Sequence, residues 1–509
     1  MKNNDSHQAS SSKKPGIVFY ISIAIVGIFV IWGAVKPVHF NEIMTAGLNW
    51  VTAHLSWFYI MATTVFVGFS LYLAFSGSRK VKLGSPDSEP DYSLFSWIGM
   101  LFAAGMGVGL VFWGVAEPIS HYVSPPPGIE AETNAAAQAA LKYAVFHWAV
   151  QPWAIYATVG LALAYFKFRK QKPGLISHAF YPLIGENVNG PIGKAINIIA
   201  VVSTTVGIAT TFGLSALQMS GGMSEVFNTP NNSTVQLIII AAVGVVFMIA
   251  VIAGVDKGIS KLSNANLILA AVLLVTVLLL GPTVLLLENL FTTLGSYINE
   301  FPSLSLDVAP YSESEWQEKW TVFYWAWLIA WAPFVGTFIA RVSRGRTIQE
   351  FVLGALLVPA LLGAVWFVVF GGTALHFQMN GTADIAGPAQ ENPEVALFLT
   401  LQQLPLGMVL SAMALVLIAI FFVTSAASAT YVLAVLSSKG TLKPKTSTEV
   451  IWGILIAGIA AALLLSGGLN ALQAASIIVA LPFTLILLAM CVSLAIALKR
   501  EKPKKNSSA

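Results

Sequence analysis

The chain has little charge and almost no cysteine. Charged residues make up only 10% of the 509 residues, and 56% of the sequence is hydrophobic. Soluble domains carry about 25% charged residues, so this composition indicates a polytopic membrane protein. The single cysteine, Cys491, lies in the last apolar run. It cannot form an intrachain disulfide or a cysteine-rich metal site, and we interpret it as a small apolar packing residue.

Enzymatic motifs are also missing. The sequence has no Walker A motif and no HExxH motif, which argues against ATP hydrolysis and metalloprotease chemistry, and we expect no enzyme. No acidic or basic residue falls deep inside an apolar run, because Glu117, Lys142 and Arg341 fall at the predicted ends. Proton-driven pumps commonly use buried Asp, Glu or His relays. An uncharged interior therefore favours Na⁺ coordination by neutral oxygens.

Apolar runs near or above 18 residues predict twelve membrane spans. Their approximate cores are 16–35, 55–76, 93–116, 140–166, 192–222, 235–254, 263–287, 320–341, 350–376, 405–436, 448–466 and 471–498. The first run lacks a small-residue cleavage motif, so we interpret it as a retained span and not as a signal peptide.

The basic residues test this count. If the N-terminus is cytoplasmic, all but three of the 27 Lys and Arg residues fall in cytoplasmic segments, the exceptions being Lys36, Lys142 and Lys319. A miscounted span would invert every later loop and destroy this asymmetry. The positive-inside rule therefore predicts a multi-pass protein of the cell (inner) membrane with both termini in the cytoplasm.

Predicted span eight contains three tryptophans within seven residues, Trp325, Trp327 and Trp331, without any charge. An indole face attracts cations through its quadrupole, so the cluster suggests a site for an organic cation or zwitterion. The alternative is an interfacial aromatic belt, where tryptophan is enriched in any membrane protein.

Predicted span four carries a second aromatic group. Trp153 and Tyr156 are three residues apart and share a helical face. Pro152 can kink the helix and so bring Trp148 towards them. His147 could carry a proton, but we interpret it as a hydrogen-bonded structural residue near the end of the span.

Spans three and ten carry two further motifs. Residues 103–109 contain three alternating glycines, which weaken a helix and could expose backbone oxygens and amides, or could allow close helix packing. Thr424 and Ser425 are adjacent hydroxyls. They could bind Na⁺, a hard cation that prefers oxygen ligands, or donate to carbonyls one turn earlier.

These motifs resemble the betaine/choline/carnitine transporter family. The resemblance is carried by residues 105–109, 112–118, 146–156 and 331–346, and it extends from the first span to the last. It implies an all-α polytopic membrane protein of twelve transmembrane helices with a leucine-transporter-like fold. In that fold two inverted five-helix repeats follow two extra helices. It also implies a homotrimer.

On this fold the chain divides into six segments. They are a disordered cytoplasmic tail (1–15), two additional helices (16–92), a first repeat of spans three to seven (93–290), an extracellular connecting segment (291–319), a second repeat of spans eight to twelve (320–500) and a short cytoplasmic tail (501–509).

By position, the resemblance implies an aromatic box around the substrate. The box residues are Trp148, Trp153, Tyr156, Trp327 and Trp331. The other side of the substrate would be lined by Ala104, Gly105, Met106, Gly107, Val108 and Gly109.

The resemblance also implies sodium sites. The principal site would use backbone oxygens of Ala103 and Met106, the Phe421 carbonyl, and the Thr424 and Ser425 hydroxyls. A second site would involve Thr204 and Phe334, although Ile208 stands where a second hydroxyl is expected, one turn after Thr204.

Two positions depart from the family pattern. The family usually has Trp-Trp where this chain has Trp327-Leu328, and Ala427 replaces a common acid. A missing indole removes about 0.5–2 kcal/mol of cation–π attraction per ring face. Leu328 is therefore a candidate specificity residue, and the expected ligand is smaller, less strictly quaternary, or a sulfonium or other zwitterion.

Together these features predict a secondary transporter. It would import a quaternary-ammonium or related zwitterionic compatible solute, such as glycine betaine, choline or carnitine, by alternating access with Na⁺ as coupling ion and no other cofactor. The alternatives are an H⁺-coupled or Na⁺-independent exchanger of a sulfonium, ectoine or taurine-type zwitterion and, in another class, a channel or a solute sensor. Expected partners are the solute, membrane lipid and further copies of the chain, with no nucleic acid.

Overall fold

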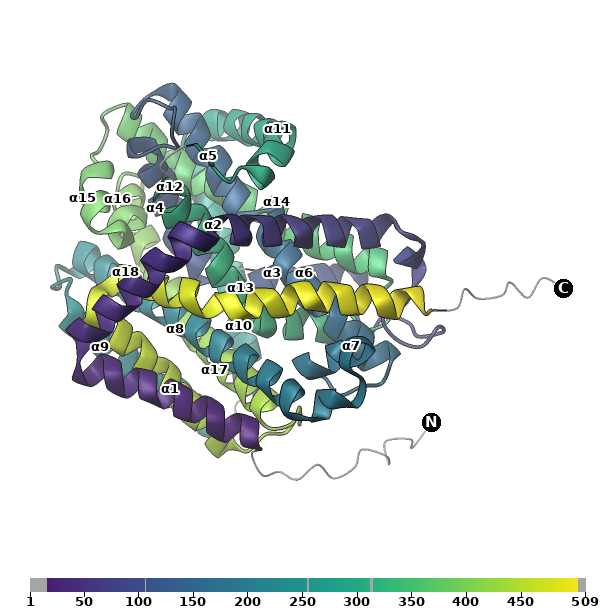
Figure 1. Cartoon of the computed structure of the whole chain (residues 1–509). Helices are drawn as coiled ribbons and strands as arrows, with labels where there is room; N and C mark the ends of the chain where they lie inside the picture. Colours follow the sequence, from purple (N-terminus) through teal and green to yellow (C-terminus); the bar gives the residue numbers. More distant parts are fainter. Residues whose placement is uncertain (1–15, 106, 254–255, 312–314, 502–509) are drawn as a thin grey trace.

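A computed structural model describes residues 16–105, 107–253, 256–311 and 315–501 of the chain (Figure 1). Within these ranges the regular structure is helical, apart from one isolated β-bridge between Lys82 and Thr347. The longer helices are α1 (Ile17–Val35), α2 (Pro37–Phe75), α8 (Pro191–Phe227), α9 (Ser233–Ile252), α10 (Asp256–Leu280), α11 (Thr283–Leu306), α13 (Phe323–Val342), α14 (Ile348–Met379), α17 (Gly407–Ser437) and α18 (Thr446–Lys499). The shorter ones are α3 (Leu94–Gly105), α4 (Val108–Val123), α5 (Asn134–Trp148), α6 (Val150–Ala164), α7 (Tyr181–Ile184), α12 (Glu315–Gln317), α15 (Ala386–Glu391) and α16 (Ala396–Gln402).

Ten helical stretches in the described ranges are long and apolar enough to cross a membrane. One of them, α18, has 54 residues and leaves helical geometry at Gly467 and Gly468. Gly468 has φ 58°, a conformation that glycine adopts more readily than other residues. The predicted spans 448–466 and 471–498 lie on either side of this break. Predicted span three is divided between α3 and α4, neither of which reaches 18 residues.

Two helices are interrupted next to residues of the predicted site. Between α3 and α4, Gly107 is extended, with φ −162° and ψ 179°. Between α5 and α6, Ala149 has φ −92° and ψ −120°. Pro152 explains the second interruption, because it has no N–H to donate to the carbonyl of Trp148, four residues earlier. The predicted kink in span four is therefore confirmed.

Two helices extend beyond the approximate cores of the predicted spans. The second helix begins at Pro37, well before the core that starts at residue 55, because polar residues such as Asn41 and His54 lower the hydropathy of a segment that is still helical. The predicted connecting segment 291–319 contains the whole second half of α11.

The basic segments gather at one end of the molecule. The carboxylate of Glu501 lies 2.8 Å from Arg169 and 2.7 Å from Lys170. Arg169 also donates to the carbonyl of Gly84, and a Cβ on Gly16 would lie 3.3 Å from the side chain of Lys439. Both ends of the described chain therefore lie beside loops that the charge pattern assigns to the same side.

Apolar side chains cover much of the outside, as on Ile249 of α9 and Phe291 of α11, which are 61% and 74% exposed. This exposure and the ten apolar helices indicate an integral membrane protein. Inside, α13 packs against α6, α8 and α18, and α18 crosses the centre of Figure 1. The aromatic residues of α6 and α13 are thereby brought together.

Candidate substrate and ion site

A cavity of about 880 Å³ is lined mainly by residues of α4, α6, α10, α13, α14 and α17, with single residues of α5, α8, α9 and α18. Its aromatic end is lined by all five residues of the predicted box, Trp148, Trp153, Tyr156, Trp327 and Trp331, and also by Leu328. Its charged lining residues are Arg341, Lys443 and Glu449, which come from the ends of α13 and α18 and from the preceding loop. The cavity thus joins an aromatic site to the basic end of the molecule. Trp325 and Trp327 are buried and Trp331 lines the cavity, so the tryptophan cluster of α13 is not a lipid-facing belt.

The box rings stand at steep angles to one another. Trp153 and Tyr156 pack edge to face, with centroids 5.5 Å apart and an interplanar angle of 84°. Trp148 and Trp327 do the same at 6.0 Å and 82°. Rings at right angles can present several faces to one bound group. A cationic head group would meet negative ring faces from more than one direction.

A carbonyl of α8 fixes two of the indoles. Trp331 Nε1 donates to the carbonyl of Gly207 at 2.8 Å, and Trp327 Nε1 reaches the same oxygen at 3.3 Å. A Cβ at position 207 would lie 2.9 Å from the Cβ of Ala330, so glycine is needed for α8 to approach α13 this closely. The sequence did not identify Gly207, since its role depends on a residue of another helix.

The start of α4 also lines the cavity. Gly107, Val108 and Gly109, which are predicted to lie beside the substrate, are among its lining residues. Met106 and the side chains of Ala103, Ala104 and Gly105 lie outside the described residues. Two side chains secure the first turn of α4: Trp366 Nε1 donates to the Leu110 carbonyl at 2.9 Å, and Gln218 Nε2 donates to the Val111 carbonyl at 3.0 Å.

Three predicted sodium ligands line the same cavity, namely Phe421, Thr424 and Ser425 of α17. The Thr424 hydroxyl donates to the Ile420 carbonyl at 2.9 Å and lies 3.3 Å from the Phe421 carbonyl. The predicted alternative, a bond to a carbonyl of the preceding turn, is therefore present. A hydroxyl that donates its proton still has lone pairs for a cation, so both roles are compatible.

The residues predicted for a second sodium site are not brought together in this way. Phe334 lines the cavity, but Thr204 is not among the lining residues. Thr204 is fully buried and its hydroxyl donates to the Ala200 carbonyl at 2.7 Å.

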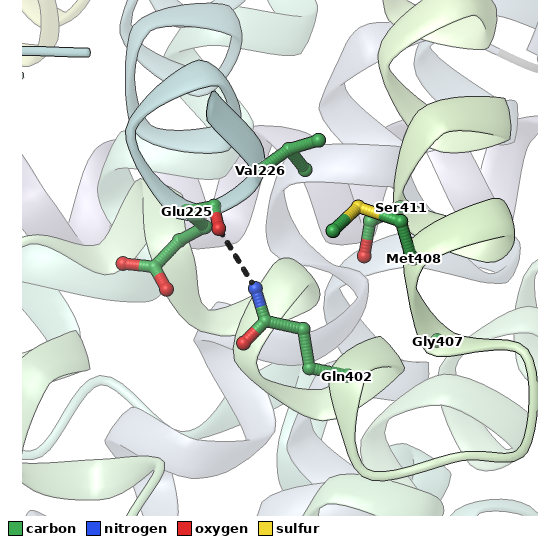
Figure 2. A pocket seen from close by; sticks show the side chains of 6 residues that line it. All are labelled: Glu225, Val226, Gln402, Gly407, Met408 and Ser411. Atoms are coloured by element: carbon green, nitrogen blue, oxygen red, sulfur yellow. Dashed lines mark hydrogen bonds between the residues drawn. The ribbon is translucent and has the colours of Figure 1, made fainter. Parts of the chain in front are cut away.

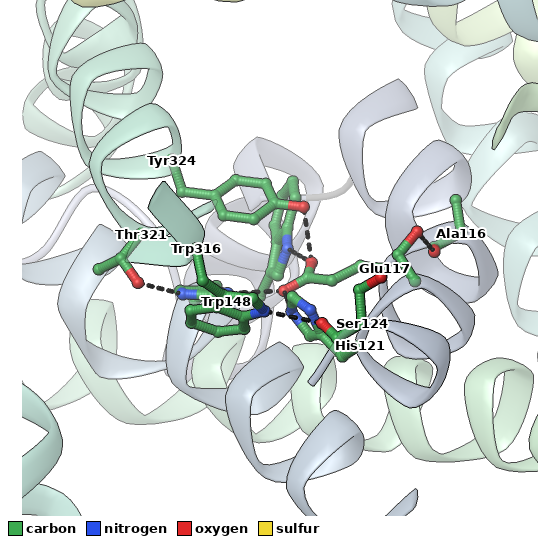
Figure 3. A network of polar contacts seen from close by, with 10 residues as sticks. Ala116, Glu117, His121, Ser124, Trp148, Trp316, Thr321 and Tyr324 are labelled. Atoms are coloured by element: carbon green, nitrogen blue, oxygen red, sulfur yellow. Dashed lines mark hydrogen bonds and ion pairs between the residues drawn. The ribbon is translucent and has the colours of Figure 1, made fainter. Parts of the chain in front are cut away.

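The prediction of an uncharged interior is wrong at Glu117. This side chain is fully buried on α4. Its Oε2 accepts from Trp148 Nε1 at 2.9 Å and from the Tyr324 hydroxyl at 2.7 Å, and its Oε1 lies 2.6 Å from His147 Nδ1 (Figure 3). Hydrogen-bond donors from α5 and α13 thus compensate the buried carboxylate, which burial alone would strongly disfavour. The predicted hydrogen-bonded role of His147 is confirmed.

The buried cluster Glu117, His121 and His147 has three potential metal ligands within 4.8 Å of one another. The Glu117 Oε1 contacts, 2.6 Å to His147 and 3.2 Å to His121, are hydrogen-bond distances. A metal ion would have to stand about 2 Å from each ligand atom, between groups that already touch. We therefore interpret the cluster as a hydrogen-bonded network.

Aromatic rings close the cavity on the side of this network. Trp113 packs edge to face against Trp320 at 5.6 Å and Tyr324 at 5.8 Å. His121 lies 4.8 Å from the ring of Trp316, whose Nε1 donates to the Ser124 carbonyl at 2.9 Å. These rings do not line the cavity themselves, but Tyr324 packs edge to face on Trp148, a lining residue, with centroids 5.3 Å apart.

Comparison with known proteins now decides the family. The profile of the betaine/carnitine/choline family transporters matches residues 17–503. The chain belongs to this family. It is 47% identical to a glycine betaine transporter of Bacillus subtilis (strain 168), over 95% of the chain and 94% of that protein. It is 46% identical to an ectoine/hydroxyectoine transporter of Virgibacillus pantothenticus, over 96% of the chain and 97% of that protein. A glycine betaine transporter of Acinetobacter baylyi is 42% identical, over 96% of the chain and 74% of that protein.

The family resemblance found in the sequence is therefore confirmed, and the chain is a membrane protein of the betaine/carnitine/choline transporter family. The relatives with the two different solutes are almost equally similar to it. Overall sequence identity thus gives no preference between the two solutes. The residues that line the cavity are the candidates for setting such a preference.

A second, smaller hollow of about 300 Å³ lies between the end of α8 and the start of α17 (Figure 2). Gln402 of α16 donates to the Glu225 carbonyl there at 3.2 Å. Ser411 also lines this hollow, which shares no lining residue with the large cavity. Its described lining has no aromatic side chain, and it is not part of the candidate site.

Proposed function

We propose that this protein imports a zwitterionic compatible solute of the betaine or ectoine type, driven by Na⁺. The observation that carries the proposal is the aromatic end of the large cavity, where five predicted box residues meet without a lining acid or base among the described residues. Ring faces attract a positive head group there. The extended backbone at Gly107 offers amides to a carboxylate.

Leu328 is the candidate specificity residue of the aromatic box. It lies among the box residues and lines the cavity, where an indole would provide another ring face. Its methyl groups suit a ligand with a smaller or delocalised positive group, such as a cyclic amidinium, as well as a trimethylammonium. The named solutes of the relatives cover both chemistries.

We expect Leu328→Trp to shift the preference towards trimethylammonium ligands. An added ring face contributes about 0.5–2 kcal/mol, so the ratio of glycine betaine affinity to ectoine affinity should rise about threefold or more. Isothermal titration of the purified protein with each solute measures this ratio. An unchanged ranking of the two solutes would show that position 328 does not set specificity.

For the coupling ion, we propose a site between the broken α3–α4 segment and α17. Phe421, Thr424 and Ser425 place oxygen atoms at the cavity, and Na⁺ prefers such ligands. Bound Na⁺ would hold the interrupted helix in the state that accepts solute. Coupling then follows because both ligands favour the same conformation.

Removing one hydroxyl tests the ion site. We expect Thr424→Val, which keeps the side-chain shape, to raise the Na⁺ concentration for half-maximal solute uptake about tenfold or more, since contacts to a charged group contribute about 1.5–3 kcal/mol. Thr430→Val is a matched control, because Thr430 lies on the same helix and donates to the Ala427 carbonyl, but does not line the cavity. Equal effects of the two changes would refute the assignment.

Ion replacement tests the coupling itself. Solute uptake into proteoliposomes should require Na⁺ when pH and membrane potential are held fixed. Unchanged uptake in K⁺ would favour H⁺ coupling or Na⁺-independent exchange. A channel or a solute sensor would give no concentrative uptake under any ion gradient, so the same experiment separates these classes from a transporter.

We also propose that the basic end of the molecule faces the cytoplasm, which the positive-inside rule supports. On that orientation the cavity opens inwards and the rings around Trp113 and Trp316 close the outer side, as in one half of an alternating-access cycle. The breaks at Gly107 and at Gly467 support twelve crossings, which we propose are arranged as two extra helices and two five-helix repeats. From the family we further propose that both termini are inside and that three copies assemble in the inner membrane. Cysteine accessibility from each side and crosslinking of the intact membrane protein test this arrangement.

A further inference from the structure

Glu117 is connected to the cavity through one side chain, that of Trp148. Glu117 is fully buried and does not line the cavity, whereas Trp148 does. Trp148 Nε1 donates to Glu117 Oε2 at 2.9 Å (Figure 3). The indole therefore has a carboxylate at its N–H edge and the cavity at another part of its surface.

The three hydrogen-bonded indoles of the box differ in their acceptors. Trp327 and Trp331 both donate to the carbonyl of Gly207, a neutral group. Trp148 donates to a carboxylate. A hydrogen bond to an ionised acceptor is roughly twice as strong as one between neutral groups, and it polarises the donor more. The box thus contains one indole whose electronic environment is different from that of its neighbours.

The orientation of the carboxylate is fixed from its other side. His147 Nδ1 and His121 Nε2 contact Oε1 at 2.6 Å and 3.2 Å. His147 Nε2 lies 2.9 Å from the Thr321 hydroxyl, which holds the ring. Because these groups occupy Oε1, Oε2 is left for Trp148 and for the hydroxyl of Tyr324.

We propose that Glu117 is a positioning residue that acts through Trp148 to increase the preference of the cavity for cationic head groups. The inference rests on the proposed function. The carboxylate holds the indole against the cavity and shifts electron density from the N–H bond into the ring, whose negative face attracts a cation.

Glu117→Gln tests the role of the charge. Glutamine has nearly the same volume and keeps one oxygen to accept from Trp148 and Tyr324. Its amide can donate to His147 Nδ1 if that ring takes its other tautomer. The network can therefore persist without the negative charge, which separates an electronic effect from a loss of structure.

The probes are glycine betaine and 3,3-dimethylbutanoate, which have the same shape and carboxylate but differ in a cationic nitrogen and a neutral carbon. We expect Glu117→Gln to lower the affinity for glycine betaine about three- to tenfold more than the affinity for the carbon analogue. Isothermal titration of the full-length protein at fixed Na⁺ and pH gives both affinities. A structural role alone would weaken both probes equally, and that result would overturn the inference.

Two control variants make the comparison specific. Tyr324→Phe removes another donor to the same oxygen but leaves the charge, so the ratio of the two affinities should change less than about twofold. In a Trp148→Phe background, which has no N–H to bond, Glu117→Gln should alter the ratio much less than in the wild type. A full effect in that background would show that Glu117 does not act through Trp148.

The inference stays testable if Glu117→Gln does not fold. Trp148→Phe and Trp331→Phe each remove one indole N–H, the first bonded to a carboxylate and the second to a neutral carbonyl. Trp148→Phe should lower the preference for glycine betaine more, and equal losses would overturn the inference. Binding of neither probe by the wild-type protein would overturn the proposed function as well, whereas wild-type binding with an unchanged ratio in Glu117→Gln refutes only the role of Glu117.

Discussion

Replacing Trp331 with alanine is expected to weaken binding of a trimethylammonium zwitterion by about tenfold or more. The substitution removes a ring face worth about 0.5–2 kcal/mol to a cation, together with apolar contact to the ligand. Trp331 also donates to the Gly207 carbonyl at 2.8 Å and packs edge to face on Phe334 at 5.3 Å, so its ring has one defined place beside the cavity. Isothermal titration with glycine betaine at saturating Na⁺ measures the loss.

Trp50→Ala is the matched control for this prediction. Trp50 is also a tryptophan of a long helix, but it is 56% exposed and does not line the cavity. Its replacement should leave the affinity unchanged. Trp153→Ala should resemble Trp331→Ala, because Trp153 lines the same end of the cavity. Wild-type affinity in both box variants would mean that the aromatic box is not the binding site.

Replacing Gly109 with alanine should reduce solute binding and uptake about tenfold or more. A Cβ at this position would lie 2.8 Å from Cη2 of Trp148 and 2.8 Å from Cη2 of Trp327, closer than real Cβ contacts allow. Overpacking of this kind costs about 1–3 kcal/mol. Neither ring can move without loss, because Trp148 is bonded to Glu117 and Trp327 is stacked on Phe323 with centroids 5.6 Å apart.

Gly99→Ala provides the comparison for Gly109→Ala. Gly99 lies on α3, and none of the described atoms beyond its own helix lies within 4 Å of the position that an added methyl group would take. Alanine should therefore be tolerated there and should favour the helix slightly. Uptake rates and melting temperatures of both variants separate a local effect on the box from a general loss of stability. If Gly109→Ala transported as well as Gly99→Ala, the two indoles would have to be free to separate.

The membrane class, the aromatic box and the hydroxyl pair could be predicted from the sequence. The five box residues lie in two short segments, and helical spacing with the kink at Pro152 grouped only the three of span four. The choice of Trp327 and Trp331 came from the family resemblance. Thr424 and Ser425 are adjacent in the chain, and although consecutive helical residues point about 100° apart, both line the cavity. Family resemblance then joined the two segments, and the cavity contains all of these residues.

Glu117 and Gly207 show what the sequence could not supply. Glu117 falls near the end of an apolar run, where a charged residue usually meets water. Its burial depends on donors that are 4, 30, 31 and 207 residues away in the chain. Gly207 binds two indoles that are 120 and 124 residues away. His121 at i+4 from Glu117 was the one local signal of a buried pair.

The sequence by itself determined that this chain crosses a membrane repeatedly, that its basic residues gather on one side, and which rings and hydroxyls could meet a solute and an ion. The first two properties depend on hydropathy and charge along the chain, whereas the choice of rings and hydroxyls rests on the family resemblance. Only the tertiary structure decided where the cavity opens, which carbonyl holds Trp331, and that a carboxylate is buried behind Trp148. Those outcomes depend on packing between distant helices, where the cost of burying a charge is offset only if its donors converge in space.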